Sequence, residues 1–148
     1  MHSIPATFTA LALCAVAASS ALAQSDFAQV AAKESGAKVT ASGLVFRSLQ
    51  DGQGASPSAT DKVKVHYRGT FPDGKEFDSS YKRNQPIDFP LNAVIPCWTE
   101  GVQLMKVGGK AKLTCPPGIA YGARGAGGVI PPNATLQFEV ELIAIAGR

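Results

Sequence analysis

Alternation of hydrophobic and polar residues is the clearest pattern in this chain. Over residues 62–69, Lys, Lys, His and Arg alternate with Val, Val, Tyr and Gly. A period of two predicts a β-strand with one buried face and one face in water. Further segments show shorter alternations or apolar runs typical of strands: 43–49, 76–78, 86–91, 111–115 and 135–146. The pattern predicts an antiparallel sheet that is solvated on one side.

One segment has the period of a helix instead. Trp98, Val102 and Met105 are spaced as i, i+4 and i+7, and the segment ends at Gly108-Gly109. This spacing predicts one short helix with a single apolar face. Such a helix must bury that face against another element, so we expect an α+β fold in which the antiparallel sheet wraps around the helix.

Two segments show no alternation. Residues 24–42 are polar and Ala-rich, with Phe27 and Val30 as apolar anchors, and predict at most one or two helical turns. Because this extension is too short for a long helical dimerisation arm, we expect a monomer. Residues 116–133 contain four Pro and five Gly. A structureless stretch of this length in a compact domain is more often functional than incidental.

The first 23 residues have the pattern of a secretory signal peptide. An apolar run over 10–18 precedes small residues at the −3 and −1 positions of a cut after Ala23. The run is too short to span a bilayer, which takes about 20 residues. The alternative is an apolar tail, whereas the bulky residue before Cys14 argues against a lipoprotein. We therefore expect a periplasmic or secreted protein, with no membrane association after cleavage.

Composition and charge exclude several functions. The 148 residues include 14 basic and 11 acidic side chains, interspersed along the chain, with a net charge of +3. No concentrated basic face is present, so nucleic acid is not an expected partner. No metal-ligand spacing, nucleophile set or phosphate-binding loop is present, and we expect neither metal nor cofactor. His66, the one histidine after signal removal, is predicted to be a solvated strand residue rather than a base.

Two cysteines remain after signal cleavage, Cys97 and Cys115. An exported chain with an even cysteine count favours a disulfide. The alternative is two small buried hydrophobic residues, because free cysteine is often buried.

Aromatic and branched apolar residues gather next to chain breaks and at the helix start. Core packing is one explanation, since aromatic residues dominate cores. Two observations favour a ligand pocket: Trp98 is the only Trp and opens the helix, and Tyr121 and Ile130 lie in the Gly- and Pro-rich stretch. An apolar cup with a few polar groups is the usual form of a ligand site.

Several motifs in this chain resemble those of the FKBP-type peptidyl-prolyl cis-trans isomerases, most closely the exported bacterial branch. The motifs occur in the family's order and approximate spacing: Val65-His66-Tyr67-x-Gly69, Asp73-Gly74-Lys75-x-Phe77-Asp78-Ser79-Ser80, Val94-Ile95-Pro96-x-Trp98-x-Glu100-Gly101, Ala120-Tyr121-Gly122 and Ile130-Pro131-Pro132-Asn133-Ala134-x-Leu136-x-Phe138. The resemblance covers about residues 43–146. It implies a curved antiparallel sheet of five or six strands around one short helix, formed by residues 43–148.

The resemblance also implies the residues of the site. Trp98 would be the pocket floor, the Ile95 N–H and the Tyr121 hydroxyl would hold the peptide, and Asp78 would be held by Tyr67 and Arg83. The positions matched to the catalytic pocket are Tyr67, Phe77, Asp78, Ile95, Trp98, Tyr121 and Phe138. The positions matched to further substrate contacts are Arg83, Ile87, Val94, Val129 and Ile130.

The function implied is rotation of X-Pro bonds in proteins that fold after export. The expected partners are proline-containing unfolded or partly folded polypeptides, and macrolide inhibitors of the immunosuppressant type. This reaction breaks no covalent bond, which agrees with the absence of acid–base machinery. The alternative is a non-catalytic proline-peptide binding module, or a holdase chaperone, on the same fold.

Overall fold

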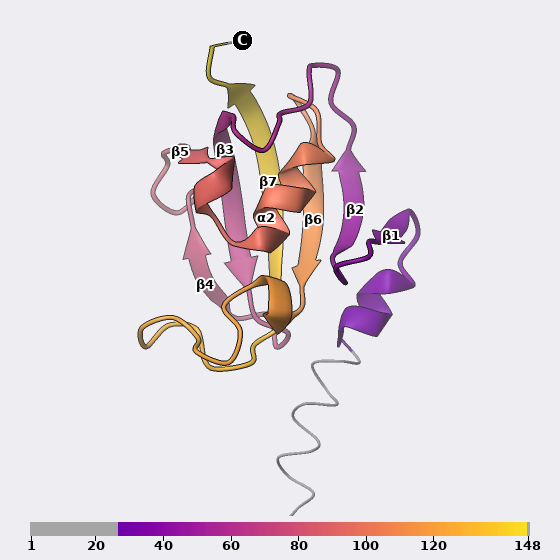
Figure 1. The fold of residues 1–148 in the computed structure, drawn as a ribbon, viewed down its shortest axis with the longest axis vertical. Coiled ribbons are helices and arrows are strands. Elements are labelled where there is room, and N and C mark those ends of the chain that lie inside the picture. Colours follow the sequence, from indigo (N-terminus) through magenta and orange to yellow (C-terminus); the bar gives the residue numbers. More distant parts are fainter. Residues whose placement is uncertain (1–26, 148) are drawn as a thin grey trace, which may run out of the picture.

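The computed structural model describes residues 27–147 (Figure 1). The expected signal peptide over 1–23 and its cleavage site after Ala23 lie outside these residues. Within the described part of the chain, no helix is long and apolar enough to cross a membrane.

An antiparallel sheet of seven strands forms the body of the described chain. The strands are β1 (Ala37–Val39), β2 (Val45–Gln50), β3 (Lys62–Thr70), β4 (Glu76–Ser79), β5 (Ile87–Pro90), β6 (Lys110–Cys115) and β7 (Leu136–Ile145). Their order across the sheet is β1-β2-β6-β7-β3-β4, and β5 also pairs with β3. The expected α+β fold class is confirmed.

The sheet has seven strands, one more than the five or six that we expected, because Ala37–Val39 of the N-terminal extension form β1. Residues 27–32 are helical, and Ala37–Val39 then pair with Val45–Arg47 of β2. The carboxylate of Glu34 holds this segment to the outer face of the sheet, with ion pairs of 2.6 Å to Arg47 and 2.7 Å to Lys112. Periodicity could not predict β1, which has three residues and no buried one.

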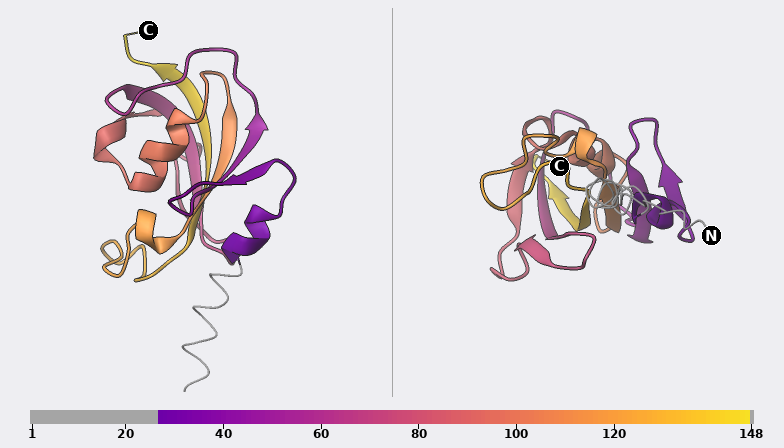
Figure 2. Two further views of the ribbon diagram at one scale, coloured as in Figure 1. Left: turned by 45° about the vertical axis from the view of Figure 1, so that its right-hand side comes forward. Right: turned by 90° about the horizontal axis from the view of Figure 1, so that it is seen from below.

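The helix α2 (Pro96–Gln103) packs against the concave face of the sheet (Figures 1 and 2). Pro96 occupies the first helical turn, where its fixed φ suits a helix start. Gly101 lets the helix approach β6 closely, because a Cβ at this position would lie 2.9 Å from the Leu113 side chain. The helix ends earlier than expected: the Leu104 N–H bonds to the Gly101 carbonyl and closes the last turn.

The 3-10 helix η1 (Leu91–Ala93) leads into α2, and the 3-10 helix η2 (Pro117–Ile119) follows β6. A disulfide joins Cys97, in the first turn of α2, to Cys115, the last residue of β6, with 5.8 Å between their Cα atoms. Both cysteines are fully buried. The disulfide therefore links the start of the helix to the sheet.

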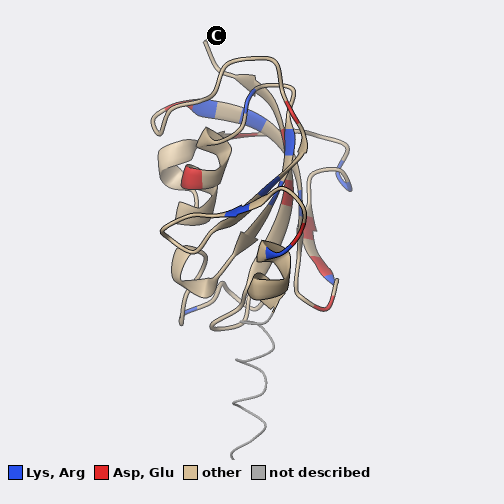
Figure 3. Ribbon diagram, turned by 90° about the vertical axis from the view of Figure 1, so that its right-hand side faces the viewer, with Lys and Arg blue, Asp and Glu red and all other residues tan. Residues whose placement is uncertain are grey.

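The outer face of the sheet carries charges of both signs (Figure 3). On β7, Glu139 faces Arg68 of β3 on one side and Lys112 of β6 on the other. The opposite, apolar face of the same strands meets α2 in one core. The predicted division of β3 and β7 into one wet face and one buried face is confirmed.

Candidate functional site

A cavity of about 470 Å³ opens between α2, the neighbouring strands and the stretch 116–133. It lies where β3, β4, β5 and β7 meet the segment leading into the helix. Its lining residues are Tyr67, Phe77, Asp78, Phe89, Ala93, Val94, Ile95, Trp98, Tyr121 and Phe138. Six of these ten side chains are aromatic, so the cavity is a mainly apolar cup.

Trp98 lies at the centre of the aromatic cluster. Its ring is nearly perpendicular to those of Tyr67, Phe89 and Phe138, with centroid distances of 5.3, 5.5 and 5.4 Å. These edge-to-face contacts are the favoured geometry for aromatic rings. Only 4% of Trp98 is exposed, and its Nε1 is the one buried side-chain nitrogen or oxygen without a hydrogen-bond partner in residues 27–147.

Gly69 makes room for one wall of the cup. A Cβ at this position would lie 2.5 Å from the Phe77 ring and 3.0 Å from the Phe138 ring. These two rings pack edge-to-face, with 5.6 Å between their centroids. Because Gly69 has no side chain, both rings can lie over β3 and face the cavity.

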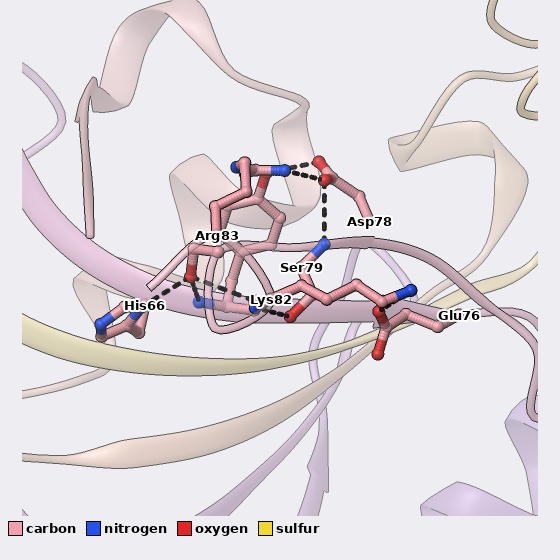
Figure 4. Close-up of polar contacts among 8 residues, drawn as sticks. His66, Glu76, Asp78, Ser79, Lys82 and Arg83 are labelled. Atoms are coloured by element: carbon pink, nitrogen blue, oxygen red, sulfur yellow. Dashed lines mark hydrogen bonds and ion pairs between the residues drawn. The ribbon is translucent and has the colours of Figure 1, made fainter. Parts of the chain in front are cut away.

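A group of hydrogen-bonded side chains lies at the rim of the cavity, where Tyr67 and Asp78 belong to the lining. Figure 4 draws the contacts of Asp78 and Arg83. The Tyr67 hydroxyl donates a short hydrogen bond to Asp78. Arg83 donates to the other carboxylate oxygen of Asp78 at 2.7 Å and to the Tyr67 hydroxyl at 3.1 Å. The Ser79 N–H also donates to Asp78, at 2.9 Å. Three neighbours thus hold the carboxylate: Tyr67, Arg83 and Ser79. The family resemblance implied the bonds from Tyr67 and Arg83.

The rim group affects the ionisation of its members. Partial burial opposes ionisation of Asp78, but the hydrogen bonds from Tyr67 and Arg83 outweigh it and lower the pKa of this carboxyl below its usual value. Burial, together with the bond to Asp78, raises the pKa of the Tyr67 hydroxyl. Asp78 is therefore ionised and Tyr67 neutral at neutral pH, which makes Tyr67 a donor and Asp78 an acceptor.

Two hydrogen-bond donors at the cavity have no protein acceptor within the described residues. Ile95 is the N-cap residue of α2, and its carbonyl accepts bonds from Trp98 and Thr99, whereas its N–H is unpaired. The hydroxyl of Tyr121, a residue that is 40% exposed, is likewise unpaired. Both groups line the cavity and can donate to carbonyl oxygens of a bound chain.

The structure brings together eight of the sequence-predicted residues in the lining: Tyr67, Phe77, Asp78, Val94, Ile95, Trp98, Tyr121 and Phe138. Arg83 contributes through its bonds to the rim.

Ile87, Val129 and Ile130 do not line this cavity. Ile87 packs against the core from β5, and Ile130 is buried in it. Val129 is 56% exposed and lies in a separate hollow formed by the loop around it.

Two lining residues, Phe89 and Ala93, were not among the positions matched to the family's pocket. Phe89 lies on the same face of β5 as Ile87, so the alternation in that strand contained the signal that could have identified it. Ala93, in η1, carries no chemical signal, and only its place beside the cavity reveals it.

His66 lies outside the cavity lining. The prediction that its side chain is solvated is only partly right, because the residue is half-buried. The imidazole is half-buried, stacks on the Tyr81 ring at 4.6 Å and lies with its Nδ1 2.8 Å from the Ser80 hydroxyl. The ring is covered because the turn after β4 folds back over β3. Residues 27–147 contain no group of three or more His, Cys, Asp or Glu that could hold a metal ion.

An apolar aromatic cup with a polar rim, on a curved sheet packed against one helix, is typical of a small-molecule or peptide-binding site. Residues 53–143 match the family model described as FKBP-type peptidyl-prolyl cis-trans isomerase. The chain belongs to this family.

Named relatives share much of the sequence. The chain is 59% identical over 114 residues to the FKBP-type peptidyl-prolyl cis-trans isomerase FkpA of Aeromonas hydrophila, covering 77% of this chain and 42% of that protein. It is 54% identical over 114 residues to the FKBP-type 22 kDa peptidyl-prolyl cis-trans isomerase of Escherichia coli, covering 77% and 55%. The chain thus spans about half the length of these relatives.

Solved structures agree in fold. The crystal structure of FkpA from Escherichia coli matches with a TM-score of 0.82 and 45% identity, over 90% of this chain and 62% of that one. The structure of a peptidyl-prolyl cis-trans isomerase from Pseudomonas syringae matches with a TM-score of 0.79 and 42% identity, over 86% and 94%.

Proposed function

We propose that this protein is a peptidyl-prolyl cis-trans isomerase that speeds rotation of X-Pro bonds in proteins folding after export. The observation that carries this proposal is the cup over Trp98, flanked by the unpaired Ile95 N–H and Tyr121 hydroxyl. Membership of a family whose named relatives are isomerases supports it.

The chemistry needs no acid, base or nucleophile. Rotation must overcome about 18 to 20 kcal/mol of amide resonance. The planar amide is more polar than the twisted transition state, so an apolar cup destabilises the ground state more than the transition state. The Ile95 N–H and the Tyr121 hydroxyl hold the flanking peptide while the prolyl ring lies over Trp98. The rim of Tyr67, Asp78 and Arg83 keeps the walls in place.

The proposal extends to location and ligands. The pattern over 1–23 supports export to the periplasm or beyond the cell. The Cys97–Cys115 disulfide supports an oxidising compartment. Macrolides of the immunosuppressant type are proposed to occupy the same cup, and the protein is proposed to be a monomer.

The decisive experiment measures cis-to-trans conversion of a four-residue X-Pro peptide with the purified protein. We expect acceleration that Trp98→Leu reduces by at least about tenfold, because the aromatic floor is lost. Val39→Ser, which changes an exposed residue of β1, is the control and should retain full activity. No acceleration by the wild-type protein would leave the alternative, a proline-peptide binding module or holdase.

A further inference from the structure

A second hollow lies on the outer side of α2 and adjoins the cup. It has a volume of about 690 Å³ and is lined by Asn92, Val94, Pro96, Thr99, Glu100, Gln103 and Leu104. Val94 lines this hollow and the cup alike. The two sites are therefore neighbours on either side of Val94, in the segment that leads into the helix. We call the second hollow the helix groove.

The helix groove presents an apolar strip to water. Leu104, at its far end, is 50% exposed, which is unusual for a leucine in a folded domain. Val94 and Pro96 supply the apolar surface at the end next to the cup. Exposed apolar surface rimmed by polar residues marks interaction sites.

The polar side chains along the groove bond mainly to their own chain. The Thr99 hydroxyl donates to the Leu91 carbonyl at 2.6 Å. The Gln103 amide nitrogen donates to the Thr99 carbonyl at 2.7 Å. With these two donors engaged, the apolar side chains of Val94, Pro96 and Leu104 supply much of the surface that a ligand in the groove would contact.

The length of the groove suits a short extended peptide. The eight residues of α2 rise by about 12 Å. An extended chain advances by about 3.3 Å per residue, so about four residues lie along such a helix. A chain held in the cup can therefore pass over Val94 and reach Leu104 within about four residues.

We propose that the helix groove binds the segment of the substrate polypeptide that flanks the prolyl bond, about four residues on one side of it. The inference rests on the proposed function, since the cup must first hold the prolyl bond. Because the groove and the cup share Val94, a chain held in the cup lies next to the groove, which favours the same chain over a separate partner as the occupant.

The groove also has a charge preference. Glu100 is the one charged side chain among its lining residues. One of its carboxylate oxygens, Oε1, accepts bonds from Thr40 and Ser42. With a carboxylate and no cation along the lining, the groove favours apolar or basic segments over acidic ones.

A peptide series tests this proposal in a protease-free assay. The four-residue X-Pro peptide is compared with versions extended by four residues on one side or on the other, each in a Leu- and Lys-containing form and an Asp-containing form. We expect the Leu- and Lys-containing extension on one side to raise kcat/KM about fivefold, as partial burial of one apolar side chain would. Extension on the other side, and the acidic extensions, should give no gain.

Variants then assign the gain to the groove. Leu104→Glu should abolish it and leave kcat/KM for the four-residue peptide unchanged. Val39→Glu, at a residue of β1 that is 58% exposed and outside the groove, should retain it. Thermal unfolding verifies that each variant is folded, and Leu104→Gln replaces Leu104→Glu if the charged variant is not.

The outcomes separate the two proposals. If the wild type does not accelerate the four-residue peptide, the proposed isomerase function fails. If the wild type does accelerate it, two results would overturn the groove proposal alone. Either no extension raises kcat/KM, or the Leu104→Glu variant keeps the gain in kcat/KM. An equal loss for short and extended peptides in the Leu104 variant would overturn it as well.

Discussion

The Ser42 hydroxyl donates a hydrogen bond of 2.5 Å to the carboxylate of Glu100, on the helix that carries Trp98. Thr40 donates to the same oxygen at 3.0 Å. The turn between β1 and β2 is thereby attached to the helix that forms the cavity floor. Residues 37–42 of the N-terminal extension are thus packed as part of the domain.

We expect Glu100→Ala to lower the free energy of unfolding by about 1 to 2 kcal/mol, because two hydroxyls lose a charged acceptor at a partly exposed site. Urea unfolding measures the change. Thr40→Val combined with Ser42→Ala should cost a similar amount. Adding both to Glu100→Ala should cost little more, since all three changes remove the same bonds. Fully additive losses would contradict the link.

Reduction of the Cys97–Cys115 disulfide should lower stability by about 3 kcal/mol, because the bridge closes a loop between residues 18 positions apart. The measurement is urea unfolding with and without dithiothreitol, with intact mass after alkylation to count free thiols. A Cys97→Ala/Cys115→Ala variant is the control, and its midpoint should not respond to the reductant. Two free thiols in the unreduced purified protein would rule out the bridge.

Tyr121→Phe should reduce kcat/KM for an X-Pro peptide by about five- to tenfold, the effect of losing one hydrogen bond. Its thermal stability should not change, because the hydroxyl has no protein partner and the residue is 40% exposed. Tyr81→Phe is the matched control. Its hydroxyl bonds to Glu141, away from the cavity lining, so its loss should leave catalysis unchanged. Equal activity in both variants would remove Tyr121 from the site.

Acid should destabilise the protein partly through Asp78. The pKa of this carboxyl is lower in the folded chain than in the unfolded chain, where it is about 4. Its contribution is therefore fully present above about pH 5 and is lost as pH falls through the folded pKa. Asp78→Asn should flatten the dependence of the urea midpoint on pH below about pH 4.

Asp88→Asn, which changes an exposed carboxyl of β5, provides the control for this measurement. It should keep the wild-type dependence on pH. If the two variants respond to acid in the same way, the hydrogen bonds at Asp78 do not stabilise its ionised form.

Local periodicity was enough to predict the long strands. The alternation in β3 and over residues 136–142 of β7 places every second residue in the core, and the structure has this pattern. It also predicted the position of α2, because Trp98 and Val102 share one buried face. Periodicity failed at β1, which has three residues and no buried one, and at the end of α2, where the local bond from the Leu104 N–H to the Gly101 carbonyl closes the helix.

The sequence by itself determined the fold class, the family and most of the aromatic residues of the cup. These properties depend on residue types at short spacings and on motifs that keep their order. The tertiary structure decided which of the candidates meet. It placed Phe89 in the lining and Ile130 in the core.

Only the tertiary structure attached residues 34–42 to the domain at two places, through the ion pairs of Glu34 and through the bonds of Thr40 and Ser42 to Glu100. It also joined the helix groove to the cup at Val94. These contacts join residues far apart in the chain. Their distances are set by how the sheet curves around the helix, and no local pattern of apolar and polar residues encodes that curvature.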